Sequence, residues 1–107
     1  MASSNRVRFR PSARRDLLAI HDYLAKVAGV KTAGRYIDRI ERACHALATF
    51  PERGTLHDDI RQGVRTIGFE RRATIAFRVL ADGVQIVRIL YGGRDIRAAL
   101  ADHIDRD

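Results

Sequence analysis

The spacing of apolar residues changes once along this chain, from a helical repeat to a strand repeat, and this change constrains the fold most. Between residues 12 and 49 apolar side chains recur every three or four positions, as they do on one face of an α-helix. The two stripes are Leu17, Ile20, Leu24 and Val27, then Ala33, Ile37, Ile40, Cys44 and Leu47. From Val64 to Tyr91 the period is two, and β-branched and aromatic residues dominate. The pattern predicts two helices followed by a set of strands.

Local signals set the ends of the two helices. Residues 6–10 alternate polar and apolar, which indicates a short half-buried strand that Pro11 ends. Ser12 is placed to cap the first helix, and Gly29 is placed to end it. The second helix is expected at about 32–49, before Pro51. The short link between the helices favours an antiparallel hairpin.

Three strands are expected at about 64–69, 73–80 and 84–91. Asp82-Gly83 predicts a hairpin between the last two, because a type I′ turn needs positive φ. The last strand is apolar on both faces except at Gln85 and Arg88, which indicates a central position with the helices over one side.

The chain after this strand predicts one more helix. Gly92-Gly93 breaks the strand, and Asp95 is placed to cap a short terminal helix. The apolar face of that helix would be Ile96, Leu100 and Ile104.

Together these elements predict an α+β fold: an N-terminal strand, an antiparallel helical hairpin, a three-stranded antiparallel meander that completes the sheet, and a short C-terminal helix. All 107 residues, 1–107, fit one domain. Residues 1–6 lack an apolar segment, and no apolar run approaches the roughly 20 residues of a membrane span, so we expect a cytoplasmic protein. A single cysteine and scattered histidines predict no disulfide, no metal site and no cofactor.

The charge of the chain points to an acidic partner. The net charge is +7 and the sequence pI is about 10.7. Lys26 and Lys31 are its lysines, and the other basic residues are arginines, whose planar guanidinium grips phosphate or carboxylate at two points. A GC-rich genome would also favour arginine over lysine, but it does not explain the net charge. We therefore expect nucleic acid or an acidic protein as partner.

The strand arginines are the main candidates for chemistry. An RNA-cleaving site that uses the 2′-hydroxyl needs cations at the phosphate and a proton donor or base. Arg65, Arg78 and Arg88 would supply the cations and Tyr91 the proton donor. Under the alternative interpretation these arginines form exposed sheet edges and cross-strand pairs such as Glu70–Arg72. Cys44 lies on an apolar stripe, which indicates a buried structural thiol, and His57 indicates a solvated loop.

Several stretches, in this order, resemble the ParE/RelE superfamily of toxins from bacterial type II toxin–antitoxin systems, in its ParE-like branch. The resemblance spans about residues 6–98 and is carried by residues 13–24, 47–54, Val64-Arg65, Phe77-Arg78-Val79 and 89–96. The Arg94-Asp95 pair resembles the corresponding stretch of ParE proteins.

This resemblance implies two functions. A ParE-like chain inhibits DNA gyrase by direct binding, without catalysis, and is neutralised by a ParD-like antitoxin. A RelE-like chain is a ribosome-dependent, metal-independent mRNA endoribonuclease, and Arg65, Arg78, Arg88 and Tyr91 would then line one concave sheet face. A third interpretation is a degenerate member that binds only its antitoxin or operator DNA. Candidates for binding the partner are the basic residues Arg61, Arg71, Arg72, Arg94 and Arg97.

Overall fold

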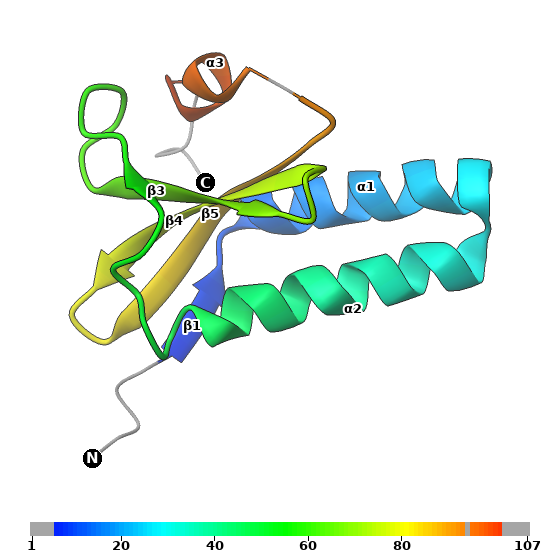
Figure 1. Cartoon of the computed structure of the whole chain (residues 1–107), viewed down its shortest axis with the longest axis horizontal. Coiled ribbons are helices and arrows are strands. Elements are labelled where there is room, and N and C mark those ends of the chain that lie inside the picture. The colour runs from blue at the N-terminus through cyan, green and yellow to red at the C-terminus, as the bar shows by residue number, and fades with distance from the viewer. Residues whose placement is uncertain (1–5, 94, 102–107) are drawn as a thin grey trace.

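Five strands form one mixed sheet, with a helical hairpin against one of its faces (Figure 1). The structure is a computed structural model that describes residues 6–93 and 95–101. Its elements are, in chain order, β1 (Arg6–Phe9), α1 (Pro11–Ala28), α2 (Val30–Ala46), β2 (Thr55–Leu56), β3 (Val64–Phe69), β4 (Ala73–Leu80), β5 (Gly83–Tyr91) and α3 (Ile96–Ala101). The predicted α+β class and order of elements are confirmed.

The strand order is β1-β5-β4-β3-β2. The pairs β2–β3, β3–β4 and β4–β5 are antiparallel. The pair β1–β5 is parallel and covers residues 83–86 of β5. The last strand is thus flanked on both sides, as its apolar sequence predicts. The two-residue β2 has no pattern in the sequence and was not predicted.

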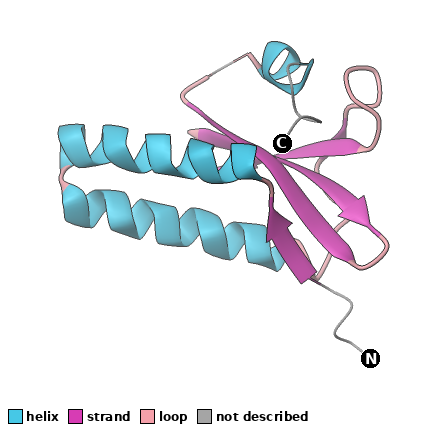
Figure 2. Cartoon of the chain, turned by 180° about the vertical axis from the view of Figure 1, so that it is seen from behind, coloured by secondary structure: helices cyan, strands magenta, loops and turns pink. Residues whose placement is uncertain are grey.

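The two long helices run side by side and extend beyond the sheet (Figure 2). Gly29, with φ of 97°, ends α1 as predicted, and α2 begins directly after it at Val30. The prediction of Ser12 as helix cap is wrong. Arg10 occupies the cap position of α1 without a side-chain hydrogen bond, and the Ser12 hydroxyl instead donates to the carbonyl oxygen of Val87 at 2.6 Å.

The predicted type I′ turn lies in a different hairpin. In the β4–β5 turn Leu80 pairs with Gly83, so the two central residues are 81 and 82, and neither has positive φ. The β3–β4 turn does have a type I′ pattern, with Glu70 and Arg71 at φ of 50° and 61°. Gly83 is required for another reason, because a Cβ there would fall on the backbone of Arg6 in β1.

Each face of the sheet has its own apolar cluster. The larger cluster lies between the sheet and the helical hairpin, and Ile40, Cys44, Phe77 and Ile86 are fully buried in it. On the opposite face α3 inserts Leu100 against three small residues of the strands, Val64, Ala76 and Val87. The sheet is therefore covered on both faces, by the hairpin on one and by the short helix on the other.

The predicted cap of the last helix is confirmed. The Asp95 carboxylate accepts hydrogen bonds from the backbone amides of Arg97 and Ala98, at 3.0 and 3.3 Å. Ile96 packs against the smaller cluster, whereas the predicted Ile104 lies outside the described residues.

Candidate functional site

The four residues proposed for RNA cleavage do not line one face of the sheet, so that prediction is wrong. Directly paired residues of neighbouring strands point to the same face. Arg65 pairs with Phe77 and therefore lies on the helix side, while Arg78, the next residue in β4, lies on the α3 side. Tyr91 also lies on the helix side, but it pairs with Ala73, four residues from Phe77 and thus roughly 13 Å along the strand from Arg65.

Arg88 is bound within the protein rather than directed to a substrate. It pairs with Ala76, next to a register shift that leaves Val87 as an extra residue. Such a bulge re-aims the side chains beside it. The guanidinium of Arg88 donates to both carboxylate oxygens of Asp16 in α1, at 2.8 and 3.0 Å. The two side chains are 16% and 11% exposed, so this is a largely buried, bidentate ion pair.

This ion pair is part of the contact that joins α1 to the edge of β5. Because β1 ends at Phe9, the backbone of β5 beyond Ile86 has no strand on that side. In place of a strand, the Ser12 hydroxyl donates a hydrogen bond to the Val87 carbonyl oxygen, and the Asp16 carboxylate accepts one from the amide of Ile89 at 2.8 Å. One turn of α1 thus replaces the missing strand, which satisfies the buried backbone groups.

Two candidate arginines hold the C-terminal helix in place. Arg61 donates to the carbonyl oxygens of Leu100 and Ala101, both at 3.3 Å, at the C-terminal end of α3. Arg97 of α3 forms an exposed ion pair with Asp59 at 3.0 Å. Arg94 lies outside the described residues. These contacts give Arg61 and Arg97 a structural role, while their predicted role in partner binding stays a prediction.

Arg71 and Arg72 are exposed on the β3–β4 turn, and this turn is tied to α2 by an ion pair. Arg39 of α2 donates to both carboxylate oxygens of Glu70, at 2.8 and 3.0 Å. The hydrogen bond from Arg39 lowers the pKa of the Glu70 carboxyl. Glu70 therefore pairs with a helix residue, and the suggested cross-strand Glu70–Arg72 pair is wrong.

Tyr91 belongs to an aromatic cluster next to this ion pair. Its ring contacts Tyr23 of α1 and Tyr36 of α2, with centroids 6.1 and 5.7 Å apart, and Tyr36 also contacts Phe69 at 5.7 Å. Burial, and then the neighbouring Tyr91 and Glu70, raise the pKa of Tyr36 to about 12. The Tyr36 hydroxyl therefore stays protonated near neutral pH and cannot act as a base.

An apolar groove lies between α1 and α2. It has a volume of about 390 Å³ and is lined by Arg14, Leu17, Leu18, His21, Ile37 and Glu41. Leu18 is 63% exposed in this groove, next to the half-buried Ile37. Apolar surface of this kind, rimmed by charged residues, is typical of a site for a protein segment.

The remaining candidates for chemistry are structural. Cys44 is fully buried, as predicted, and burial followed by the charge of Glu41 raises the pKa of its thiol to about 12. His57 forms a hydrogen bond through Nε2 to the Thr66 hydroxyl at 2.8 Å. In residues 6–93 and 95–101 no three His, Cys, Asp or Glu side chains gather closely enough to hold a metal ion, and no helix is long and apolar enough to span a membrane.

The sequence interpretation overlooked Asp16, Glu70 as the partner of α2, and the aromatic residues Tyr23 and Tyr36. Asp16 carried one signal: it is an acid one helical turn after Ser12, on the side of α1 that faces the sheet. Its partner Arg88 lies 72 residues away, and no local pattern links the two.

Comparisons with known proteins agree on one family. A family model described as the ParE toxin of the type II toxin–antitoxin system parDE matches residues 7–96. A curated protein named Toxin ParE3, from Caulobacter vibrioides, is 33% identical over 94 residues, which cover 88% of this chain and 92% of that protein. A solved structure titled as a chromosomal ParDE system from P. aeruginosa matches with a TM-score of 0.73 and 26% identity, over 84% of this chain and 98% of the other.

Proposed function

This chain belongs to the ParE toxin family of type II toxin–antitoxin systems, and we propose that it inhibits DNA gyrase by direct binding and is neutralised by a ParD-like antitoxin. The observation that carries the proposal is the family match over residues 7–96, together with the separation of the four residues that cleavage would need. Gyrase inhibition by binding needs no catalytic group, whereas cleavage of mRNA needs several in one place.

The RelE-type alternative loses its support from the geometry. Arg88 is engaged by Asp16, and Arg65 and Arg78 lie on opposite faces of the sheet. On the α3 side, Leu100 covers part of the face that Arg78 occupies. This arrangement supports inhibition by binding over cleavage by these four residues.

The groove between α1 and α2 is our proposed seat for an antitoxin segment. An amphipathic helix would place its apolar side chains over Leu18 and Ile37 and its charged ones near Arg14. The net charge of +7 would steer an acidic segment to the toxin.

A gyrase assay tests the target. Purified toxin is expected to block DNA supercoiling by gyrase. In a separate assay with toxin and translating ribosomes, the mRNA is expected to remain uncut. Gyrase that supercoils normally at high toxin concentration would remove the proposal. Cuts in the mRNA would restore the RelE-type function. Normal growth on expression without antitoxin, together with inactive toxin in the gyrase assay, would indicate the degenerate member.

A single substitution tests the antitoxin groove. Leu18→Glu is expected to weaken antitoxin binding roughly 10- to 100-fold, because burial of a leucine contributes about 1.5–3 kcal/mol and each 1.4 kcal/mol is tenfold. Val27→Glu is the matched control: Val27 is 59% exposed on the same helix, and nine residues place it on the opposite side of α1. Equal antitoxin affinities for the two variants, measured by calorimetry, would place the antitoxin elsewhere.

A further inference from the structure

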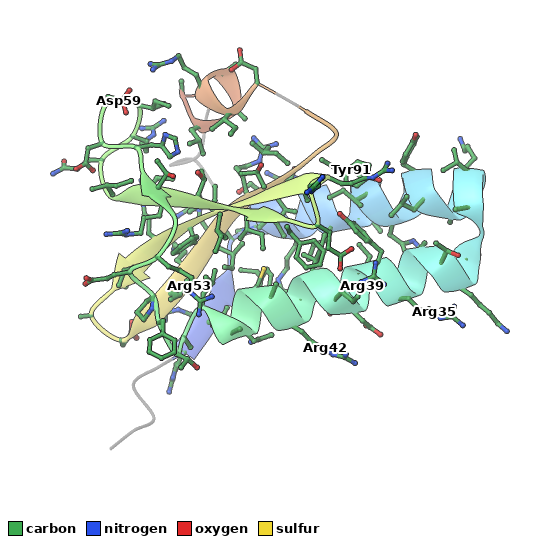
Figure 3. All side chains as sticks on the ribbon, viewed as in Figure 1. Arg35, Arg39, Arg42, Arg53, Asp59 and Tyr91 are labelled. Carbon is green, nitrogen blue, oxygen red and sulfur yellow. The ribbon has the colours of Figure 1, made fainter. Side chains whose placement is uncertain are left out.

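Four basic side chains follow one another along an exposed face of α2, which we call the α2 ridge: Lys31, Arg35, Arg39 and Arg42. Their spacing of four, four and three residues keeps them within about 80° around the helix axis and spreads them over roughly 16 Å along it. All four are exposed. Figure 3 shows Arg35 and Arg42 projecting from α2, with Arg39 between them along the helix on the side toward the β3–β4 turn.

The groups of the α2 ridge differ in how firmly they are held. Arg39 is fixed by Glu70 and lies over the Tyr36 ring at 5.4 Å. Arg35 and Arg42 form no ion pair or hydrogen bond through their side chains with any other residue in the described ranges. Together with Arg39 and the acidic Asp38, they line a shallow hollow of about 220 Å³. Arg35 and Arg42 thus flank Arg39, which Glu70 holds in place.

The β3–β4 turn adds to this charge. Because Glu70 is bound to Arg39, the next two residues, Arg71 and Arg72, are held beside the α2 ridge and are exposed. The six cations of ridge and turn exceed the two acids among them, Asp38 and Glu70, by four charges. This density of positive charge is expected to attract a ligand that carries several negative charges.

We propose that the α2 ridge, with the adjoining turn, binds the phosphate backbone of duplex DNA. A protein partner is disfavoured, because protein interfaces are anchored by buried apolar and aromatic residues, and no large apolar side chain is exposed in residues 31–42. Leu18, which is exposed and apolar, lies on α1 in the groove between α1 and α2, not in the hollow beside the α2 ridge. The regular negative charge of a phosphate backbone matches a surface that has an excess of four positive charges and no apolar anchor in residues 31–42.

Within the α2 ridge and the adjoining turn, residues 31–42 and 70–72, no aromatic ring is exposed, which favours a duplex over a single strand. Proteins that hold single strands stack bases on aromatic side chains. The aromatic ring within α2, Tyr36, is 7% exposed and lies beneath Arg39. Along a duplex axis, the roughly 16 Å of the ridge parallels about five phosphates of one strand at 3.4 Å each. The choice of DNA over RNA rests on the proposed function, since gyrase acts on duplex DNA.

Fluorescence anisotropy with a 20-base-pair DNA duplex tests the proposal on toxin alone. For about four phosphate contacts, the logarithm of the binding constant should fall with the logarithm of salt concentration with a slope near −3.6. The variant Arg35→Gln/Arg42→Gln should reduce the slope by about 1.8 and weaken binding at least tenfold at low salt. Both residues are exposed and outside the core, so circular dichroism and thermal unfolding should remain unchanged.

The control variant is Arg6→Gln/Arg8→Gln, which has the same net charge but lies on β1. It should bind DNA within about twofold of the unmodified toxin. Equal loss in both variants would mean that net charge alone attracts DNA and would overturn the proposal, as would the absence of binding at low salt. An acidic peptide that displaces DNA at equal charge concentration, or tenfold tighter binding of an RNA duplex of the same sequence, would overturn it too.

Because gyrase is absent from this assay, its failure leaves the proposed target untouched. Conversely, toxin that binds DNA through the α2 ridge but does not inhibit gyrase would refute the target and leave the ridge as a DNA-binding surface.

Discussion

Asp16→Ala is the most informative substitution for the fold, because one carboxylate serves two parts of β5. It accepts two hydrogen bonds from the Arg88 guanidinium and a third from the amide of Ile89. With 11% of the Asp16 side chain and 16% of the Arg88 side chain exposed, little water can replace these bonds. Alanine at this position would remove the Asp16 carboxylate from a largely buried cation and from a backbone amide.

The expected loss of stability follows from these two groups. Breaking a buried ion pair by removing one partner costs about 3–5 kcal/mol, and the slight exposure here favours the lower end, about 3 kcal/mol. An unsatisfied backbone amide adds about 1 kcal/mol. The sum, about 4 kcal/mol, is a large part of the roughly 5–15 kcal/mol that stabilises a domain. For a chain of this size it corresponds to a fall in melting temperature of roughly 16 °C.

A double-mutant cycle, measured by urea unfolding, checks the cause. Arg88→Met on the Asp16→Ala background should recover about 2 kcal/mol, because the buried cation that lost its carboxylate is removed and an apolar chain of similar length takes its place. The control is Asp82→Ala, which breaks the exposed Arg8–Asp82 pair at 3.1 Å and should cost less than about 1 kcal/mol. A loss below 1 kcal/mol for Asp16→Ala, or no recovery in the double variant, would refute the reasoning.

Two further predictions concern the turns. Gly83→Ala should lower the free energy of unfolding by more than about 2 kcal/mol in a urea titration, because its Cβ would meet the β1 backbone. The control, Gly68→Ala, has open space around the new Cβ and should lower it by less than about 1 kcal/mol. Equal losses of stability in the two variants would contradict the prediction. The pKa of Glu70 is lowered in the folded state, so its pair with Arg39 stabilises the fold above the ordinary carboxyl pKa and is lost as pH falls through the lowered value. In an NMR titration, Arg39→Gln should raise the Glu70 pKa to its ordinary value, and an unchanged midpoint would show that Arg39 is not the cause.

The sequence predicted the long elements well because their signals are local. The strands at 64–69, 73–80 and 84–91 fall within a residue of the observed β3, β4 and β5, since a period of two reflects a sheet with buried faces. The second helix is shifted by two or three residues, to Val30–Ala46, since Gly29 ends one helix and directly precedes the next. Helix ends depend on a few residues, and the stripes of apolar residues do not fix them.

The failures concern contacts between distant parts of the chain. The parallel pairing of β1 with β5 joins residues more than 70 positions apart and leaves no repeat in the sequence. The turn prediction relied on Asp82-Gly83, but positive φ occurs at Glu70 and Arg71, where the ion pair to Arg39 holds a conformation that these residue types disfavour. Turn type here is decided by tertiary contacts as well as by glycine.

The same limit explains why the site could be predicted only in part. The sequence does not distinguish an arginine that binds a partner from one that supports the fold. The structure separates arginines bound within the protein from arginines that are exposed on its surface. Arg88 and Arg61 are used internally, by Asp16 and by the carbonyl oxygens of α3, although both were candidates for function. Arg35 and Arg42, which no sequence pattern marks as functional, carry exposed charge on α2. An excess of arginine in a small basic protein therefore predicts an anionic partner, but the arginines that reach that partner are those without an acid or a carbonyl group already within reach.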